Sequence, residues 1–178
     1  MMPLRMKAFS ESSAASAAAL AAALRATGRA AHPRCFACGE PADGGLGLRF
    51  AVEADGGVVA RWECPAGGEG YPGILHGGLT ATLLDAAMTQ ALFARGIVAR
   101  TGELTVRYRQ PVVLGGAATV RARLRRSLGP LFELEAEVRQ GASLCATARA
   151  KFMRAPGEPA ASAAGGAGQA GAGSFSKP

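Results

Sequence analysis

Residues 73–88 read GILHGGLTATLLDAAM, and this stretch decides the fold that the sequence predicts. Its first residues are rich in glycine, which is typical of a loop. The residues that follow place apolar side chains at helical spacing. One stripe of that helix consists of Leu84, Ala87, Met88, Ala91 and Leu92. We therefore expect a helix that starts after His76, continues to about Arg95, stops at Gly96 and faces a core.

Asp85 interrupts this apolar run about two turns after the predicted helix start. Aspartate is a poor residue for a helix interior, and the position is too deep for an N-cap. Burial of an unpaired charge is costly, so such a residue usually has a partner or a function. Asp85 is interpreted as a functional carboxylate. A purely structural role, with its side chain bonded to a neighbouring backbone group, stays open.

His76 precedes two glycines at the predicted start of the helix. Glycines let a ligand approach backbone N–H groups closely, and these groups lie at the positive end of the helix dipole. A ligand carbonyl group could be polarised by these N–H groups, and the Asp85 carboxylate lies about two turns further along the predicted helix. The stretch is therefore predicted to be a site, although His76 alone could simply cap or orient the loop.

Length and charge limit the class of protein. A chain of 178 residues is long enough for one domain plus tails. Its net charge of +7 and pI near 9.9 favour anionic partners, although a basic surface without function is the simpler alternative. No apolar run reaches the length of a transmembrane helix. The early Arg5 and Lys7 resemble an export signal, but Glu11 and Arg25 interrupt the Ala-rich stretch, so we expect a cytoplasmic protein.

Composition divides the chain into three parts. Residues 1–31 form an Ala-rich arm that we expect to be flexible and dispensable, with helix propensity over residues 14–26. Residues 32–155 form the predicted domain. Residues 156–178 are dominated by Ala, Gly, Ser and Pro, which cannot offset chain entropy by packing, so we expect disorder.

The segment at residues 32–39, HPRCFACG, carries the only cysteine pair at close spacing. His32, Cys35 and Cys38 could supply three zinc ligands, with Cys64 as a fourth. No second Cys-x-x-Cys or His-rich segment completes the pattern. We therefore favour a tight turn with partly buried free thiols and predict no metal.

Alternating apolar and polar residues predict strands on both sides of the helix. Two strands are expected before it, at 46–53 and 58–64, joined by a turn at 54–57. Four strands are expected after it, at 103–108, 118–125, 132–138 and 144–152. Short connections make sequential strands antiparallel. The sequence thus predicts an α+β layer, with one long helix against a curved antiparallel sheet of five to six strands.

Charged side chains are expected on the outer face of this sheet. Arg121, Arg123 and Arg125 should face a row of glutamates across the hairpin closed near Gly129. These glutamates are Glu133, Glu135 and Glu137. The cations with fewer obvious partners are Arg107, Arg109, Arg126, Arg149 and Lys151. No interleaving of aromatic and basic residues suggests recognition of nucleic acid.

The order of elements and three motifs resemble the hotdog-fold acyl-CoA thioesterases, in particular their phenylacetic-acid-degradation-like branch. The motifs are CFACG at 35–39, GYPGILHGG at 70–78 and LTVRYRQP at 104–111. The resemblance covers residues 34–154. It implies a homodimer with joined sheets, active sites at the subunit interface and, in many members, a dimer of dimers.

The resemblance also implies roles for individual residues. Asp85 would activate water or attack the thioester carbonyl, the Gly78 N–H would bind the carbonyl oxygen, and His76 would line the same hole. The residues expected to contact substrate are Glu69, Gly70, Gly77, Thr89, Thr101, Arg107 and Arg109. The free cations of the sheet would meet coenzyme A phosphates. No cofactor is implied other than the coenzyme A of the substrate.

One departure from the family pattern bears on activity. Many members carry Asn or Gln shortly before the His-Gly-Gly, whereas this chain has Glu69 and Gly70. An ionised carboxylate cannot donate the hydrogen bond that an amide donates. Two alternatives to thioester hydrolysis therefore stay open: a non-catalytic acyl-thioester binder, and a hotdog-type dehydratase or hydratase.

Overall fold

The computed structural model describes the backbone of residues 5–154 and the side chains of residues 16–154. The predicted disordered tail at 156–178 lies outside the described residues. None of the helices within the described range combines the length and the hydropathy needed to cross a membrane.

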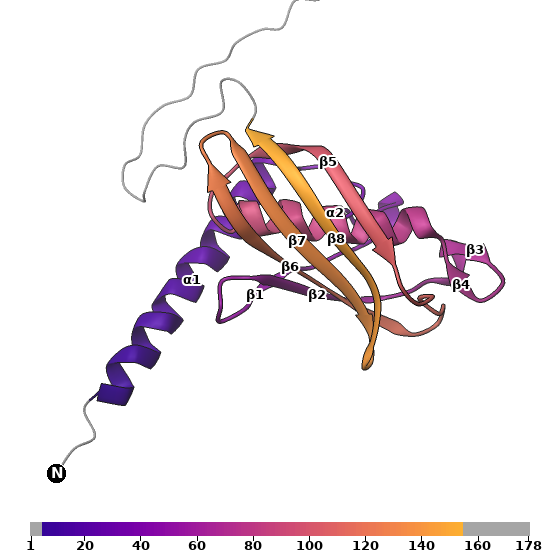
Figure 1. The fold of residues 1–178 in the computed structure, drawn as a ribbon, viewed down its shortest axis with the longest axis horizontal. Coiled ribbons are helices and arrows are strands. Elements are labelled where there is room, and N and C mark those ends of the chain that lie inside the picture. Colours follow the sequence, from indigo (N-terminus) through magenta and orange to yellow (C-terminus); the bar gives the residue numbers. More distant parts are fainter. Residues whose placement is uncertain (1–4, 155–178) are drawn as a thin grey trace, which may run out of the picture.

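A six-stranded antiparallel sheet wraps around helix α2 (Gly77–Phe93), as Figure 1 shows. The strands lie in the order β1-β2-β6-β7-β8-β5. Their bounds are Ala51–Val52 (β1), Val58–Glu63 (β2), Ala117–Leu128 (β6), Leu131–Gln140 (β7), Ser143–Arg154 (β8) and Ala99–Tyr108 (β5). The predicted α+β layer with one long helix is confirmed.

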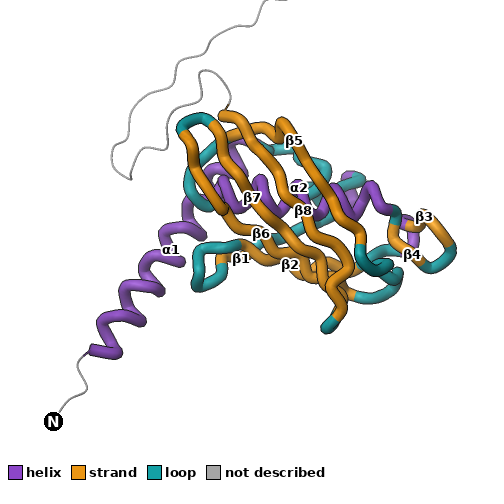
Figure 2. Tube along the Cα trace, viewed as in Figure 1, coloured by secondary structure: helices purple, strands orange, loops and turns teal. Residues whose placement is uncertain are grey.

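A small two-stranded sheet precedes α2. It consists of β3 (Glu69–Tyr71) and β4 (Ile74–Leu75), which form a hairpin next to the N-terminal end of α2 (Figure 2). Two short 3₁₀ turns, Pro41–Asp43 and Ala66–Gly68, complete the described elements. The hairpin therefore lies beside the His-Gly-Gly segment.

The core lies between α2 and the inner face of the sheet. The predicted stripe of α2 is buried there, with Leu84, Met88 and Leu92 fully excluded from solvent. Burial continues around the second half of α2, from Ala86 to Phe93, because a second helix covers its other side. A helix that is apolar all round is typical of such a buried position.

That second helix is α1 (Arg5–Ala31), which is longer than the predicted 14–26. Figure 1 shows its first half extending away from the sheet and its last turns lying beside α2. Leu24 is only 7% exposed and belongs to the core. Whether the arm is flexible or dispensable stays a prediction, but its C-terminal part packs on the domain.

The strand predicted at 46–53 is much shorter in the structure. Only Ala51 and Val52 join the sheet, because the preceding backbone bonds to the cysteine turn instead. Leu46 N–H donates to Phe36 O (2.8 Å) and Leu48 N–H donates to Ala37 O (3.0 Å). The predicted alternation of buried and exposed side chains is present, since Leu48 is buried and Arg49 is exposed. The backbone of this segment, however, forms its hydrogen bonds with the cysteine turn and not with the sheet.

The packing of α1 predicts a loss of stability on truncation of Leu24. Leu24→Ala should lower the free energy of unfolding by about 2–5 kcal/mol, because it leaves a cavity between α1 and the core. Leu128→Ala is the matched control, because Leu128 is 47% exposed and should lose about 0.5 kcal/mol or less. Urea denaturation measures both. Equal stability of the two variants would show that α1 does not dock.

Candidate active site

His76 caps the N-terminus of α2. Its Nδ1 accepts a hydrogen bond from the Gly78 N–H at 2.9 Å, and its carbonyl oxygen accepts from the Thr80 N–H at 3.1 Å. Because Nδ1 is the acceptor, the neutral ring carries its proton on Nε2 in this arrangement. A Cβ at Gly78 would lie only 2.9 Å from His76 Nδ1, so glycine is needed there for the ring to fold back onto the helix.

The peptide unit between Gly77 and Gly78 is held at both ends. Tyr108 Oη donates to the Gly77 carbonyl oxygen at 2.8 Å, while the N–H of the same unit donates to His76. This fixes the orientation of the first helical turn. The Gly77 N–H belongs to the preceding peptide unit, and among the described residues no acceptor lies within hydrogen-bond distance of it.

This arrangement changes which N–H group can receive a ligand. The resemblance implied the Gly78 N–H as the oxyanion donor, but in the structure that group is already bonded to His76 Nδ1. Among the described residues at the start of α2, the N–H groups of Gly77 and Leu79 have no hydrogen-bond partner, and Gly77 is the more exposed residue at this positive end of the helix.

The structure brings Asp85 and Thr101 together, a contact that the sequence analysis did not predict. Thr101 Oγ1 donates to Asp85 Oδ1 at 2.7 Å, and Asp85 is partly exposed. Thr101 lies on β5, where the pairing with β8 shifts between Thr101 and Glu103. The extra residue, Gly102, leaves Thr101 opposite the buried Phe152 and places Glu103 on the outer face. This bulge therefore aims the Thr101 hydroxyl at α2.

Two predicted contacts on β3 have structural partners. Glu69 Oε1 accepts a hydrogen bond from the Gly73 N–H at 2.7 Å and thereby closes the β3–β4 turn. Gly70 packs against His76: a Cβ at position 70 would lie 2.9 Å from His76 Cα and 3.2 Å from Cδ2. In this arrangement the position has no room for the amide side chain found in many members of the family.

Thr89 lies on α2 about one turn beyond Asp85, and it is only 7% exposed. Thr89 therefore lies on the same face of α2 as Asp85, where its side chain is almost fully covered. Its predicted contact with substrate stays a prediction.

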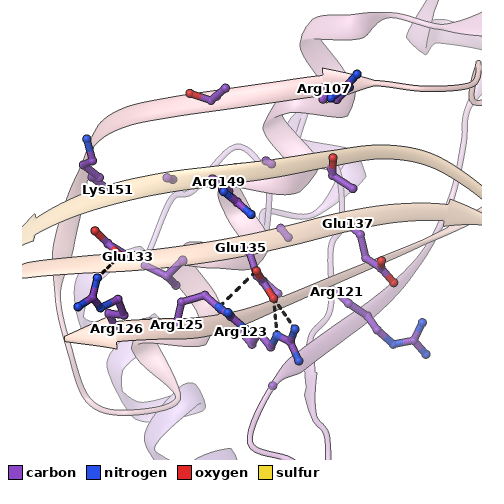
Figure 3. Close-up of a pocket in the computed structure, with 18 of the residues that line it drawn as sticks. Arg107, Arg121, Arg123, Arg125, Arg126, Glu133, Glu135, Glu137, Arg149 and Lys151 are labelled. Atoms are coloured by element: carbon purple, nitrogen blue, oxygen red, sulfur yellow. Dashed lines mark hydrogen bonds and ion pairs between the residues drawn. The ribbon is translucent and has the colours of Figure 1, made fainter.

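Arg107 and Arg109 are not brought to Asp85 within one chain. Both line a hollow of about 1150 Å³ on the outer face of the sheet, opposite α2 (Figure 3). The alternation of β5 explains this, because Leu104 and Val106 face the core while Arg107 faces outward. Their contact with a substrate stays a prediction.

The charge ladder of the outer face is confirmed with one change of register. Glu137 and Glu135 lie opposite Arg121 and Arg123, but a bulge after Leu124 places Arg126 opposite Glu133.

The ion pairs depart from the predicted pairing at two arginines, Arg121 and Arg125. Arg123 and Arg125 both contact Glu135, at 2.5 and 3.4 Å, and Arg121 contacts Glu53 at 3.0 Å. Such exposed pairs contribute little stability individually.

Two cations that were expected to lack partners have them. Arg126 contacts Glu133 at 4.0 Å, and Lys151 Nζ donates to Glu103 at 2.7 Å. The hydrogen bond with Glu103 raises the pKa of Lys151. These two cations are therefore less available to an anionic ligand than the sequence analysis assumed.

The weak zinc candidates do not form a cluster. In the part of the chain that the structure describes, no three His, Cys, Asp or Glu side chains are placed to hold a metal ion. The ring of His32 instead packs edge-on against Phe93, with ring centroids 4.9 Å apart.

Tyr108 is the site residue that sequence reasoning missed. In the sequence it simply continues the inward-facing positions of β5, after Leu104 and Val106, and so reads as a core aromatic. In the structure it is 56% exposed and holds the first turn of α2. Only the spatial closeness of the β5 end and the helix start reveals this role.

Comparisons with known proteins show what this chain is similar to. Residues 72–151 match the thioesterase superfamily. Over 88 residues the chain is 31% identical to acyl-coenzyme A thioesterase THEM4 of Rattus norvegicus, which covers 48% of this chain and 38% of that protein. The chain thus spans well under half the length of this relative.

Two solved structures show the same fold. The PaaI protein from the phenylacetic acid degradation operon of E. coli superimposes with a TM-score of 0.65 at 20% identity, over 78% of this chain and 97% of that chain. The protein smu.793 from Streptococcus mutans UA159, bound to acetyl CoA, has a TM-score of 0.57 at 19% identity, over 61% and 88%. The predicted hotdog fold is confirmed.

The contact between Gly70 and His76 predicts the effect of a single methyl group. Gly70→Ala should lower the free energy of unfolding by about 1–3 kcal/mol, because the new Cβ overlaps the His76 backbone. Gly67→Ala is the control, because a Cβ there meets nothing within 4 Å, and it should change stability by about 0.5 kcal/mol or less. Thermal denaturation of both variants tests this. A Gly70→Ala protein as stable as the control would contradict the described packing of His76.

Proposed function

Because residues 72–151 match the thioesterase superfamily, we propose that this protein hydrolyses acyl-CoA thioesters to a free acid and coenzyme A. The observation that carries the proposal is the pairing of a carboxylate with an open helix N-terminus. Asp85 lies on α2 about two turns beyond the exposed Gly77 N–H, and Thr101 orients its carboxylate. Similarity to an acyl-CoA thioesterase supports the choice of substrate.

The helix start would bind the thioester carbonyl. The carbonyl oxygen would accept a hydrogen bond from the Gly77 N–H, and the helix dipole would stabilise the negative charge that develops on it. The Gly77 N–H belongs to the His76–Gly77 peptide unit, whose carbonyl oxygen accepts a hydrogen bond from the Thr80 N–H at 3.1 Å, so this donor would need little reorganisation on binding. His76 would line the same hole, with its Nε2–H directed toward the ligand side.

Asp85 would act on the carbonyl carbon by one of two routes. As a general base, it would take a proton from water that attacks the carbon. As a nucleophile, its free oxygen would attack the carbon, the C–S bond would break and the coenzyme A thiolate would leave, and water would then hydrolyse the resulting anhydride to the free acid and the Asp85 carboxylate. In both routes Thr101 would keep Asp85 Oδ1 in place and leave Oδ2 for the reaction.

The coenzyme A moiety would extend away from the helix start. Arg107 and Arg109 lie on the outer face of the sheet, so they would contact phosphates only at the site of a neighbouring copy. The acetyl CoA bound to a structural neighbour supports coenzyme A as the thiol portion. Glu69, Gly70 and Thr89 would line the acyl side.

Replacement of Asp85 tests the proposal. Asp85→Asn should lower kcat for release of free thiol from acyl-CoA by about 10²-fold or more with little change in KM, because the base or nucleophile is lost. Its melting temperature should be retained or raised, because a partly buried charge is removed. Asp43→Asn is the control, since Asp43 is exposed on a surface turn. The assay should cover short, medium, long and aromatic acyl chains.

The result can contradict the proposal in two ways. Normal turnover by a stably folded Asp85→Asn protein would remove Asp85 from the chemistry. Tight binding of acyl-CoA by the wild type without thiol release would favour a non-catalytic binder, and a change in enoyl absorbance would favour a hydratase.

We also propose a homodimer, or a dimer of such dimers, located in the cytoplasm. β5 is the last strand of the sheet, so its outer edge offers unpaired backbone groups to another strand. Thr101 and Tyr108 lie on this strand, so pairing of two β5 strands would close each site with a second chain.

Light scattering after size-exclusion chromatography tests the assembly. We expect at least a dimer at micromolar concentration, because the site is open at the β5 edge in one chain. A stable monomer with full thioesterase activity would contradict the assembly.

A further inference from the structure

The turn that carries Cys35 and Cys38 has no part in the proposed reaction, yet it is tightly built. The Gly39 N–H donates to the Cys35 carbonyl oxygen at 2.6 Å, which closes one turn. In such a turn, residues three apart lie on the same side. The two thiols therefore lie on the same side of one turn, and both cysteines are free and only partly buried.

Surrounding contacts hold this turn rigidly. The strand-like segment after it donates hydrogen bonds to the Phe36, Ala37 and Gly39 carbonyl oxygens, and the Arg49 guanidinium donates to the Cys38 carbonyl oxygen at 2.6 Å. A Cβ at Gly45 would lie 2.4 Å from Gly39, so the two segments are in direct backbone contact. The thiols are therefore kept close without the need to order a flexible loop.

A small hollow opens beside Cys38. It has a volume of about 250 Å³, lies between α1 and the domain, and is lined by Cys38 and Gln90 together with the basic residues Arg25, Arg29, His32 and Arg49. Gln90 Nε2 donates to Cys38 Sγ at 3.3 Å. The hollow is large enough to bring a small polar oxidant next to the turn that carries both thiols.

We propose that Cys35 and Cys38 are a reversible dithiol–disulfide modification site whose oxidant is a hydroperoxide. The partly exposed Cys35 reacts first: its thiolate attacks one peroxide oxygen, the O–O bond breaks, and Cys35 becomes a sulfenic acid. Cys38 then attacks the Cys35 sulfur, the S–S bond forms and water leaves. With hydrogen peroxide, two thiols lose two electrons and two protons, and the peroxide becomes two waters.

The order of the two cysteines follows from their surroundings. Burial, followed by the neighbouring Cys35, raises the pKa of Cys38 to about 11, so Cys38 remains a thiol at neutral pH. Cys38 suits the second step, because its sulfur then attacks the Cys35 sulfur within the same turn. Cys64 and Cys145 serve as internal controls for oxidation. They are only 2% and 1% exposed, and burial raises the pKa of each thiol.

Peptide mass spectrometry of the full-length protein tests the proposal. The reduced protein is treated with hydrogen peroxide, blocked with N-ethylmaleimide and digested. We expect the peptide with Cys35 and Cys38 to lose two hydrogens at least about 10-fold faster than Cys64 or Cys145 is oxidised. Dithiothreitol should restore both thiols.

Two variants fix the order of the steps. Cys38→Ser should accumulate a sulfenic acid at Cys35 that dimedone traps, whereas Cys35→Ser should give no such adduct at Cys38. Oxidation of Cys35 and Cys38 no faster than Cys64 and Cys145 would overturn the proposal. Disulfides between chains, or direct conversion of either cysteine to sulfinic acid in the wild type, would overturn it as well. None of these readouts depends on thioesterase activity.

Discussion

The candidate site depends on one peptide unit, the one that joins Gly77 to Gly78. Its carbonyl oxygen is held by Tyr108 from β5, and its N–H is held by His76. The bond to His76 could not form with a side chain at Gly78, because a Cβ there would overlap the imidazole ring. A helix N-terminus usually leaves several N–H groups unsatisfied. Here the Gly78 N–H is capped by His76, whereas the Gly77 N–H, which belongs to the preceding peptide unit, stays open.

The second requirement is a carboxylate within an otherwise apolar helix. α2 buries nearly every residue after Ala86, yet Asp85 stays partly exposed and accepts the Thr101 hydroxyl hydrogen bond. Hydrogen bonds to charged groups contribute about 1.5–3 kcal/mol. The β5 bulge at Gly102 supplies this bond by turning Thr101 inward while Glu103 turns outward. The site thus combines a carboxylate from α2 with a hydroxyl from β5.

Periodicity and glycine positions were sufficient to predict the helix, its end at Gly96 and most strands. The family resemblance placed Asp85 and Thr101 at the same site, but their hydrogen bond was not predicted, since nothing in the spacing links α2 to β5. The bulges after Thr101 and Leu124 were not predictable, because the alternation of inward-facing and outward-facing residues simply resumes after one extra residue. Tyr108 and the backbone bonds of Leu46 and Leu48 depend on which segments meet in space, which a sequence pattern does not encode.

The most direct test of the account is a crystal structure with an acyl-CoA analogue in which a methylene group replaces the thioester sulfur. The account predicts the ketone oxygen about 3 Å from the Gly77 nitrogen. It also predicts the Asp85 carboxylate beside the ketone carbon, either in contact or through one water molecule. A ketone bound away from the start of α2, for example over the outer face of the sheet, would contradict the central claim.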